Sequence, residues 1–317
     1  MNENYLTADL DLASVIDLKG LSPDDFIDYY KRNAASIDKD LQKHGALKFT
    51  GVEIDSVDTF QHITGNISSK FLRYVDGNSP RTKLAGDVYT STEYDKTQRI
   101  TMHNELSYSA KWPNKLFFSC LIPAETGGET LLADSREILK ALDPEIVSEV
   151  ERKGIIYIRN LHGGTGLGPS WQDTFETTDK LEMEEFCKSM QIDFEWTNGD
   201  TLKIKQTSPG IINHSITNEK VWFNQVDQFH PCHLGEEMYQ TMQLVYEKPQ
   251  DFPMYVMFGD GSDISESMIE EILKTIDTVT MAPKWNENEL LIVDNVLMSH
   301  GRNSFTGDRK VVVSMSE

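Results

Sequence analysis

The pattern of apolar and polar positions predicts many short strands. Residues 46–52 alternate between apolar and polar side chains, as a half-buried strand does. Other segments are rich in β-branched and aromatic residues or form short apolar runs, and both features favour strands: residues 88–92, 115–122, 130–134, 155–158, 290–295 and 309–315. Strands therefore bracket the middle of the chain. This order is typical of a β-sandwich or barrel and unlike an alternating parallel βαβ fold.

Helices are predicted at the start of the chain and between the strands. Residues 22–44 begin with Ser22 as a cap, have apolar residues every three or four positions, and stop at Gly45. Shorter helices are expected over residues 55–64, 135–142, 182–190 and 264–276, and another begins at Asp143. The sequence has no internal repeat and no clear linker. We therefore expect a mostly β single domain over residues 1–317, with an N-terminal helical segment and helical insertions.

Charge and composition restrict the partners of this chain. Its 30 basic and 51 acidic residues give a net charge of −21, which repels the phosphate backbone of nucleic acids. A small anionic substrate remains compatible, because a single arginine can outweigh a distant acidic surface. No window approaches the ~20 apolar residues of a membrane-spanning helix, and the first 20 residues lack the pattern of a secretory signal. The three cysteines lie far apart, so a cytoplasmic protein that binds no membrane is expected.

One histidine has an acidic residue two positions later. His103 and Glu105 form this pair, although about 1.3 such pairs are expected by chance among eight histidines. If residues 103–105 are extended, both side chains lie on one face and can bind one metal ion; a surface His–Glu contact is the alternative. His300 follows a predicted strand and turn. Two histidines and one carboxylate would leave three positions of a metal open, the facial arrangement of non-haem Fe(II) oxygenases.

Arg309 opens the last predicted strand, nine residues after His300. An arginine that projects into a barrel needs a partner, and a small-molecule carboxylate could bind it through bidentate hydrogen bonds. A salt bridge to one of the 51 acidic residues is the alternative. The segment 230–233, His-Pro-Cys-His, has no partner motif at zinc-site spacing, so we interpret it as a loop. His162 begins a seven-residue stretch with four glycines, which predicts a mobile loop.

Several motifs in order resemble the TauD/TfdA family of Fe(II)- and 2-oxoglutarate-dependent oxygenases. The resemblance covers roughly residues 40–317 and is closest to the SyrP-like branch of amino-acid hydroxylases. It rests on His103-Asn104-Glu105-Leu106-Ser107-Tyr108, Trp112-Pro113, Gly127-Gly128-Glu129-Thr130, Asp134-Ser135-Arg136, Val221-Trp222-Phe223-Asn224-Gln225 and His300-Gly301-Arg302 with Arg309.

The resemblance implies a fold and a cofactor site. The fold would be a double-stranded β-helix, a jelly-roll or cupin-like barrel. His103, Glu105 and His300 would hold Fe(II), and O2 would be a co-substrate. Arg309, helped by the Thr130 hydroxyl, would bind the distal carboxylate of 2-oxoglutarate.

The resemblance also bears on the substrate. Halogenases of this family lack the metal-binding carboxylate, so Glu105 disfavours halogenation. Taurine-type enzymes carry a substrate-facing arginine where this chain has Val313, so the substrate must be bound elsewhere. The candidate substrate contacts are Arg81, Asn104, His162 and Asn224. For Arg81, an ion pair that only ties its loop to an acidic residue is the alternative.

The expected function is hydroxylation of a small, carboxylate-bearing amino acid or amino-acid derivative, free or carrier-bound, in specialised biosynthesis. The same chemistry could instead close a ring through a substrate radical, as in kainoid-type synthases. A non-catalytic cupin-like binding protein and a zinc hydrolase are alternatives from other classes. The complete ligand set argues against the first, and the lack of a positioned general base argues against the second.

Overall fold

The computed structural model describes residues 14–79, 81–197 and 200–317; the first 13 residues of the expected domain, and Pro80 beside Arg81, lie outside the described part. In that part, the larger sheet has seven strands in the order β1-β2-β16-β6-β19-β4-β3. Strands β2, β16, β6 and β19 are joined by antiparallel pairing, whereas β1 runs parallel to β2. The strands are β1 (Val15–Leu21), β2 (Ala46–Val52), β3 (Lys83–Ala85), β4 (Val88–Thr90), β6 (Lys115–Ile122), β16 (Glu289–Asp294) and β19 (Lys310–Ser316).

A second sheet completes the barrel. Its order is β15-β8-β17-β5, with β15 (Thr280–Met281), β8 (Thr130–Asp134), β17 (Met298–Arg302) and β5 (Ile100–His103). Both sheets contribute side chains to one buried cluster, including Leu131 and Met298 from this sheet and Phe118 and Val313 from the larger one. The two sheets therefore pack face to face, and the expected mostly β, jelly-roll-like core with flanking helices is confirmed.

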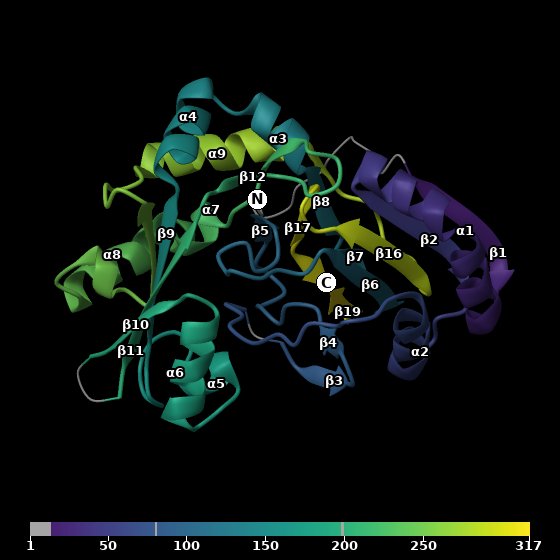
Figure 1. Cartoon of the computed structure of the whole chain (residues 1–317), viewed down its shortest axis with the longest axis horizontal. Helices are drawn as coiled ribbons and strands as arrows, with labels where there is room; N and C mark the ends of the chain where they lie inside the picture. Colours follow the sequence, from purple (N-terminus) through teal and green to yellow (C-terminus); the bar gives the residue numbers. More distant parts are fainter. Residues whose placement is uncertain (1–13, 80, 198–199) are drawn as a thin grey trace.

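The insertion between β8 and β15 builds a third sheet and most of the helices. That sheet has the order β10-β11-β9-β14, with β9 (Ile155–Leu161), β10 (Asp193–Trp196), β11 (Leu202–Ser208) and β14 (Met254–Phe258). In Figure 1, α5, α6 and α8 lie beside this sheet, at the opposite end of the molecule from α1. The helices of this insertion are α3 (Ser135–Ala141), α4 (Pro144–Lys153), α5 (Trp171–Phe175), α6 (Lys180–Ser189), α7 (Val226–Phe229), α8 (Glu236–Val245) and α9 (Glu266–Thr278). Short pairs β12 (Ile211–Asn213) with β13 (Lys220–Trp222) and β7 (Thr126–Gly127) with β18 (Phe305–Thr306) complete the strands described.

Some of the predicted helices begin at capping serines, whereas α5, which is capped by Ser170, was not predicted. Helix α1 (Pro23–His44) begins after Ser22, whose hydroxyl accepts from the Asp25 N–H, and ends at Gly45, which has φ of 73°. Helix α2 (Val57–Ile67) is capped in the same way by Ser56. Helix α8 was not predicted. It has no side-chain cap, and two of its apolar residues, Leu244 and Val245, are 89% and 62% exposed, so it lacks the usual one-sided pattern.

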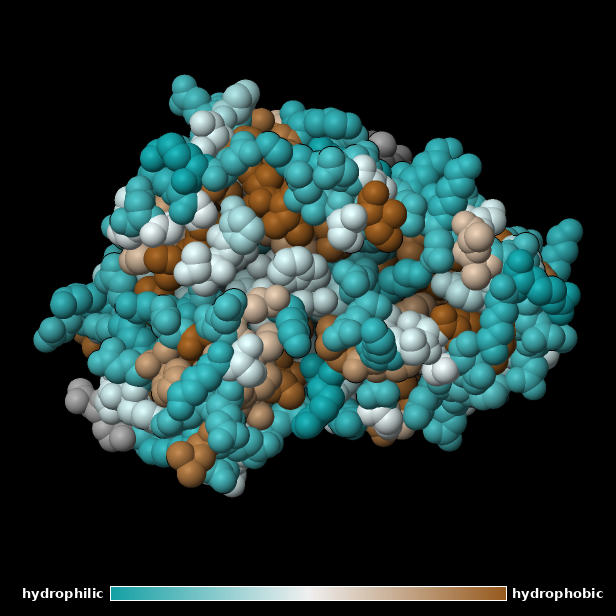
Figure 2. Space-filling model, viewed as in Figure 1, coloured by the Kyte–Doolittle hydropathy of each residue, from teal (hydrophilic) through white to brown (hydrophobic). Residues whose placement is uncertain are grey.

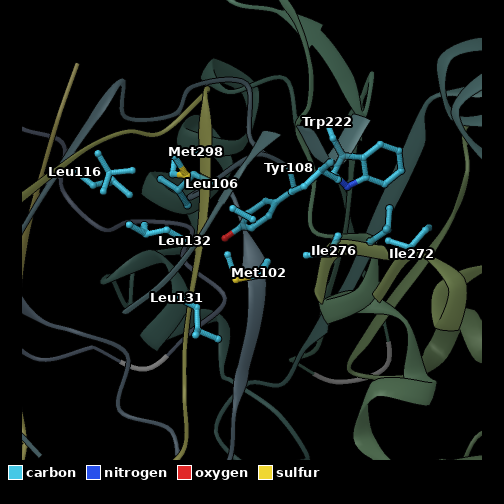
Figure 3. Packing of buried hydrophobic residues seen from close by; sticks show 14 of the residues in the cluster. Met102, Leu106, Tyr108, Leu116, Leu131, Leu132, Trp222, Ile272, Ile276 and Met298 are labelled. Atoms are coloured by element: carbon cyan, nitrogen blue, oxygen red, sulfur yellow. The ribbon is translucent and has the colours of Figure 1, made fainter. Parts of the chain in front are cut away.

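The core joins the barrel to the insertion. Figure 3 shows Tyr108 between two groups of side chains. One group includes Leu132 of the barrel, and the other includes Trp222 of β13 and Ile276 of α9. The Tyr108 hydroxyl donates to the Asp76 carbonyl over 2.8 Å, which ties the core to the 74–79 loop. Figure 2 shows hydrophilic residues over most of the visible face, with hydrophobic patches between them. Within the described ranges, no helix is both long enough and apolar enough to cross a membrane.

Candidate metal centre

Two histidines far apart in the sequence are brought together by strand pairing. His103 ends β5 and lies directly opposite His300 of the antiparallel strand β17. Their ring centroids are 4.3 Å apart. The close approach depends on Gly301, because a Cβ atom there would lie 2.5 Å from the Ile100 carbonyl oxygen. The sheet register therefore places both imidazoles on one side of the strand pair.

The third candidate, Glu105, reaches the same place from a turn. Residues 103–105 do not meet the condition of being extended throughout, because β5 ends at His103 and Glu105 lies in the turn that follows. The side chain of Asn295 fixes this turn. Its Oδ1 accepts from the Glu105 N–H over 2.7 Å, and its Nδ2 donates to the Glu105 carbonyl over 3.0 Å. A buried amide clamp, rather than strand geometry, thus orients the carboxylate.

The three side chains form a compact, buried group of potential metal ligands. One ligand atom from each of His103, Glu105 and His300 lies within 4.8 Å of the others, and all three residues are buried. His103 Nδ1 lies 2.9 Å from the Thr101 carbonyl and donates a hydrogen bond to it, which leaves the Nε2 lone pair free for a metal. Two imidazoles and one carboxylate suit a divalent iron ion with open positions.

Burial keeps both imidazoles neutral, which metal binding requires. Desolvation lowers the pKa of His103, although the Glu105 charge partly opposes this. Desolvation lowers the pKa of His300 even further, and repulsion from His103 and Arg81 adds to the effect. In the described structure, the buried His300 Nδ1 atom has no hydrogen-bond partner. The donor set is therefore ready for a cation without first losing protons.

Arg81 contacts the candidate ligand Glu105 directly. Its Nη2 atom forms a buried ion pair with Glu105 Oε2, and its guanidinium lies 4.4 Å from the centre of the Tyr74 ring. A carboxylate has about four lone-pair sites on two oxygens, so Arg81 and a metal ion can share Glu105. The Arg81 Nε and Nη1 atoms are buried without a partner among the described residues.

Arg309 and Thr130 lie in the same small cavity as the two histidines. Arg309 Nε donates to the Gly128 carbonyl over 2.8 Å, and its Nη1 donates to Ser91 Oγ over 3.0 Å. Burial and the nearby Arg302 charge lower the pKa of Arg309 to about 10. The guanidinium is held by neutral acceptors and can receive an anion. Arg309 and Thr130 thus line the same cavity as the two candidate metal-binding histidines.

Trp285 orients the Thr130 hydroxyl. Its Nε1–H donates to Thr130 Oγ over 3.0 Å, so the hydroxyl accepts on one side and keeps its own proton for another acceptor. The sequence contained no signal for this contact, because Trp285 follows no recognisable motif. Gln228 was missed for the same reason. Its Nε2 donates over 3.1 Å to the Thr101 carbonyl, the same oxygen that accepts from His103, and so helps to hold that acceptor in place.

The four candidate substrate residues have different surroundings. Arg81 lines the small cavity and a second, larger one. Asn104 is buried, and its Nδ2 donates to the Asn295 carbonyl over 2.7 Å and to Ser135 Oγ. Asn224 is also buried; its side chain bonds the Gly210 carbonyl and the Val226 N–H. The His162 ring contacts two groups of its own loop, the Gly168 carbonyl and the Gly164 N–H. Of these four, Arg81 alone lines the two cavities.

The segment 230–233 does not assemble a second site. His230 Nδ1 lies 2.8 Å from Cys232 Sγ, and His230 Nε2 lies 3.1 Å from the Ile264 carbonyl. Among the residues that the structure describes, the group at His103 is the one cluster of three or more side chains with metal-ligand geometry. The interpretation of this segment as a loop agrees with its short 3-10 turn.

The chain is similar to known oxygenases over nearly its whole length. The family described as Taurine catabolism dioxygenase TauD, TfdA family matches residues 7–315. The dapdiamide synthesis protein DdaC of Enterobacter agglomerans is 34% identical over 88% of this chain and 84% of that protein. A clavaminate synthase-like protein of Arabidopsis thaliana is 30% identical over 96% of this chain and 91% of that protein.

Solved structures share the fold at low sequence identity. AAD-2, crystallised with Mn(II) and N-oxalylglycine, superposes with a TM-score of 0.53 at 14% identity, over 97% of this chain and 95% of that chain. PvcB, described as an Fe, alpha-ketoglutarate dependent oxygenase from an isonitrile synthetic pathway, gives a TM-score of 0.52 at 11% identity, over 95% and 84%. This likeness supports the barrel assignment.

Proposed function

The chain belongs to the TauD, TfdA family of Fe(II)- and 2-oxoglutarate-dependent oxygenases, and from this premise we propose that it hydroxylates a small, carboxylate-bearing molecule derived from an amino acid. The observation that carries the proposal is the buried cluster of His103, Glu105 and His300. Three guanidinium groups, those of Arg81, Arg302 and Arg309, line the cavity beside it. Backbone carbonyls such as those of Thr92 and Asp95 bind Arg302. The other two cations, next to the neutral imidazoles, suit the joint binding of two carboxylates.

Each residue has a distinct role in this proposal. His103, Glu105 and His300 hold Fe(II) on one face, and the bound metal supplies, with 2-oxoglutarate and O2, the oxidising power for a C–H bond. Arg309 and Thr130 bind the far carboxylate of 2-oxoglutarate by charge-assisted hydrogen bonds. The Asn295 clamp and the Thr101 carbonyl keep two of the ligands in place, so the site is ordered before any cofactor binds.

Arg81 is the proposed anchor of the substrate. Its Nε and Nη1 atoms keep three N–H groups that have no acceptor in the described structure. A substrate carboxylate would satisfy them and would lie close to the metal, because the same guanidinium contacts Glu105. Holding one end of the substrate fixes which carbon faces the metal. The relative named for dapdiamide synthesis supports a biosynthetic role. The substrate could be free or carried by another protein.

An anaerobic titration tests the proposal. Fe(II) and then 2-oxoglutarate are added to the metal-free protein without O2, and the visible charge-transfer band of the chelate is recorded. We expect the band in the unmodified protein and in His62→Ala, which alters an exposed surface histidine, but not in His103→Ala. With O2 and amino-acid-derived carboxylates, release of succinate and of hydroxylated product should follow. A normal band in His103→Ala, or no band in the unmodified protein, would contradict the proposed site.

A further inference from the structure

A second cavity extends from the metal centre toward the third sheet. It has a volume of about 1050 Å³, at the upper end of the ~300–1,000 Å³ that pockets for drug-sized ligands occupy. Arg81 and Ile100 line both this cavity and the smaller one that holds His103 and His300. Thr101 and Gln228, which contact His103, line it too. The large cavity is therefore the space next to the metal that a substrate can occupy, and it exceeds the needs of a free amino acid.

Among the described residues that line this cavity, Arg81 is the cation with the most unused donors, whereas two lining carboxylates, Glu93 and Asp173, accept from the hydroxyls of Thr82 and Ser170. Arg99 is bound through both terminal nitrogens by Asp277. Glu176 accepts from Arg73 over 2.7 Å. Arg81 is different, because its ion pair with Glu105 leaves two of its three nitrogens without acceptors among the described residues. One anionic group of a ligand is thus recognised, and it is recognised at the end of the cavity beside the metal.

Away from Arg81, much of the cavity lining is apolar. Leu234 and Met238 lie at its edge, where they are 43% and 48% exposed to solvent. Met254 and Leu273 continue this wall from β14 and α9. Exposed apolar side chains on a cavity wall gain free energy when a ligand covers them, and flexible methionines adapt to different chain shapes. We call these four residues the apolar wall.

We propose that the substrate is an amphipathic carboxylate, in which a carboxylate bound by Arg81 continues into an apolar chain that covers Leu234, Met238, Met254 and Leu273. The inference rests on the proposed function, since it takes Arg81 as the anchor beside the metal. It narrows the amino-acid derivative to one whose nitrogen or side chain carries an acyl or alkyl extension. A small polar amino acid would leave most of the cavity filled with water and the apolar wall uncovered.

Chain-length dependence of binding tests the inference. The probes are N-acetyl-, N-butanoyl-, N-hexanoyl- and N-octanoylglycine, with octylamine as a probe that lacks the carboxylate. Binding is measured by calorimetry on the metal-free protein, and independently by the change in the anaerobic Fe(II)–2-oxoglutarate band. We expect Kd to fall about two- to fourfold per methylene that reaches the wall, and octylamine not to bind.

Two variants on helix α8 test where the acyl chain of the ligand binds. Met238→Glu places a charge on the apolar wall, and Leu244→Glu places the same charge on α8 at a residue that is 89% exposed and does not line the cavity. Met238→Glu should weaken octanoylglycine at least tenfold and leave acetylglycine unchanged, whereas Leu244→Glu should affect neither. Arg81→Gln should weaken every N-acylglycine by a similar factor of about tenfold or more.

The outcomes separate this inference from the proposed function. If the band forms but Kd does not depend on chain length, the apolar-wall assignment fails and the oxygenase proposal stands. Equal effects of Met238→Glu and Leu244→Glu, or binding of octylamine as tight as that of octanoylglycine, would also overturn it. If the band does not form in the unmodified protein, the proposed function fails, whatever the calorimetry gives.

Discussion

Replacement of Arg309 by methionine should remove the response to 2-oxoglutarate while the fold is kept. The guanidinium is bound by two neutral acceptors, Gly128 O and Ser91 Oγ, and burial together with the Arg302 charge lowers its pKa to about 10. The protein thus holds a partly desolvated cation at an energetic disadvantage. Methionine has a similar length and no charge, so we expect the free energy of unfolding of the ligand-free variant to stay within about 1 kcal/mol of the unmodified value.

The magnitude follows from the loss of one charged partner. A hydrogen bond to a charged group contributes about 1.5–3 kcal/mol, which corresponds to a loss of roughly 10- to 150-fold in 2-oxoglutarate affinity. At a concentration 100 times its Kd, 2-oxoglutarate should stabilise the unmodified protein by about 2.7 kcal/mol. At a 50-fold weaker affinity the same concentration gives only about 0.6 kcal/mol. For a chain of 317 residues the corresponding rises in Tm are about 4 °C and about 1 °C.

Thermal unfolding of the Fe(II)-loaded protein under anaerobic conditions, with and without 2-oxoglutarate, measures both the stability of the variant and its stabilisation by 2-oxoglutarate. Lys310→Met is the matched control, because it removes the exposed cation next in the chain; its Tm should rise with 2-oxoglutarate as in the unmodified protein. The reasoning is refuted if Arg309→Met keeps a 2-oxoglutarate Kd within threefold of the unmodified value. It is also refuted if the variant binds 2-oxoglutarate normally but loses affinity for the organic substrate.

Three further predictions concern other parts of the site. Burial raises the pKa of Asp227 to about 6 from 3.8, so its ionised form destabilises the folded state above pH 6. In urea unfolding at pH 7.5, Asp227→Asn should raise the free energy of unfolding by up to about 3 kcal/mol, and this gain should disappear as the pH falls toward 4. The exposed control Asp260→Asn should show no such gain. Trp285→Phe, which removes the donor to Thr130, should raise the Kd of 2-oxoglutarate about three- to tenfold, with no change in Fe(II) affinity measured in the absence of 2-oxoglutarate. His300→Ala should abolish Fe(II) binding in equilibrium dialysis while the far-ultraviolet circular dichroism stays unchanged.

The barrel could be predicted because its strands carry a strong local signal. The apolar runs around Phe117 and Ile292 lie in β6 and β16, and both strands are buried at the centre of the larger sheet. Strand β1 was missed, because its residues are mostly exposed or intermediate and it pairs at the sheet edge. Strands β10 and β11 were missed as well. Their side chains alternate, but their apolar residues pack against α5 and α6, a contact that local pattern cannot reveal.

The supporting residues of the site depend on contacts between distant parts of the chain. Asn295 lies 190 residues from Glu105, and Gln228 lies 125 residues from His103. Polar residues are common in turns. The neighbouring sequence does not distinguish a polar residue that hydrogen-bonds a candidate metal ligand from one that faces water. The candidate metal ligands were predicted only through an ordered set of motifs, since the His103–Glu105 spacing by itself is expected by chance. The supporting contacts follow from strand register, which the sequence pattern does not fix across 200 residues.

Arg81 has two interpretations from the sequence, and the structure bears directly on one of them. The sequence left open whether this arginine binds substrate or ties its loop to an acidic residue. In the structure it does form an ion pair, but the partner is Glu105, itself a candidate metal ligand. A guanidinium has five N–H donors, so the ion pair does not exhaust it, and two nitrogens remain without acceptors in the described structure. Any anion that binds there must change the electrostatic potential at Glu105, and therefore the affinity of this carboxylate for a metal ion. By reciprocity, a bound metal must change the affinity for that anion. If Arg81 anchors the substrate and Glu105 binds the metal, as we propose, substrate binding and metal binding are therefore coupled through this ion pair.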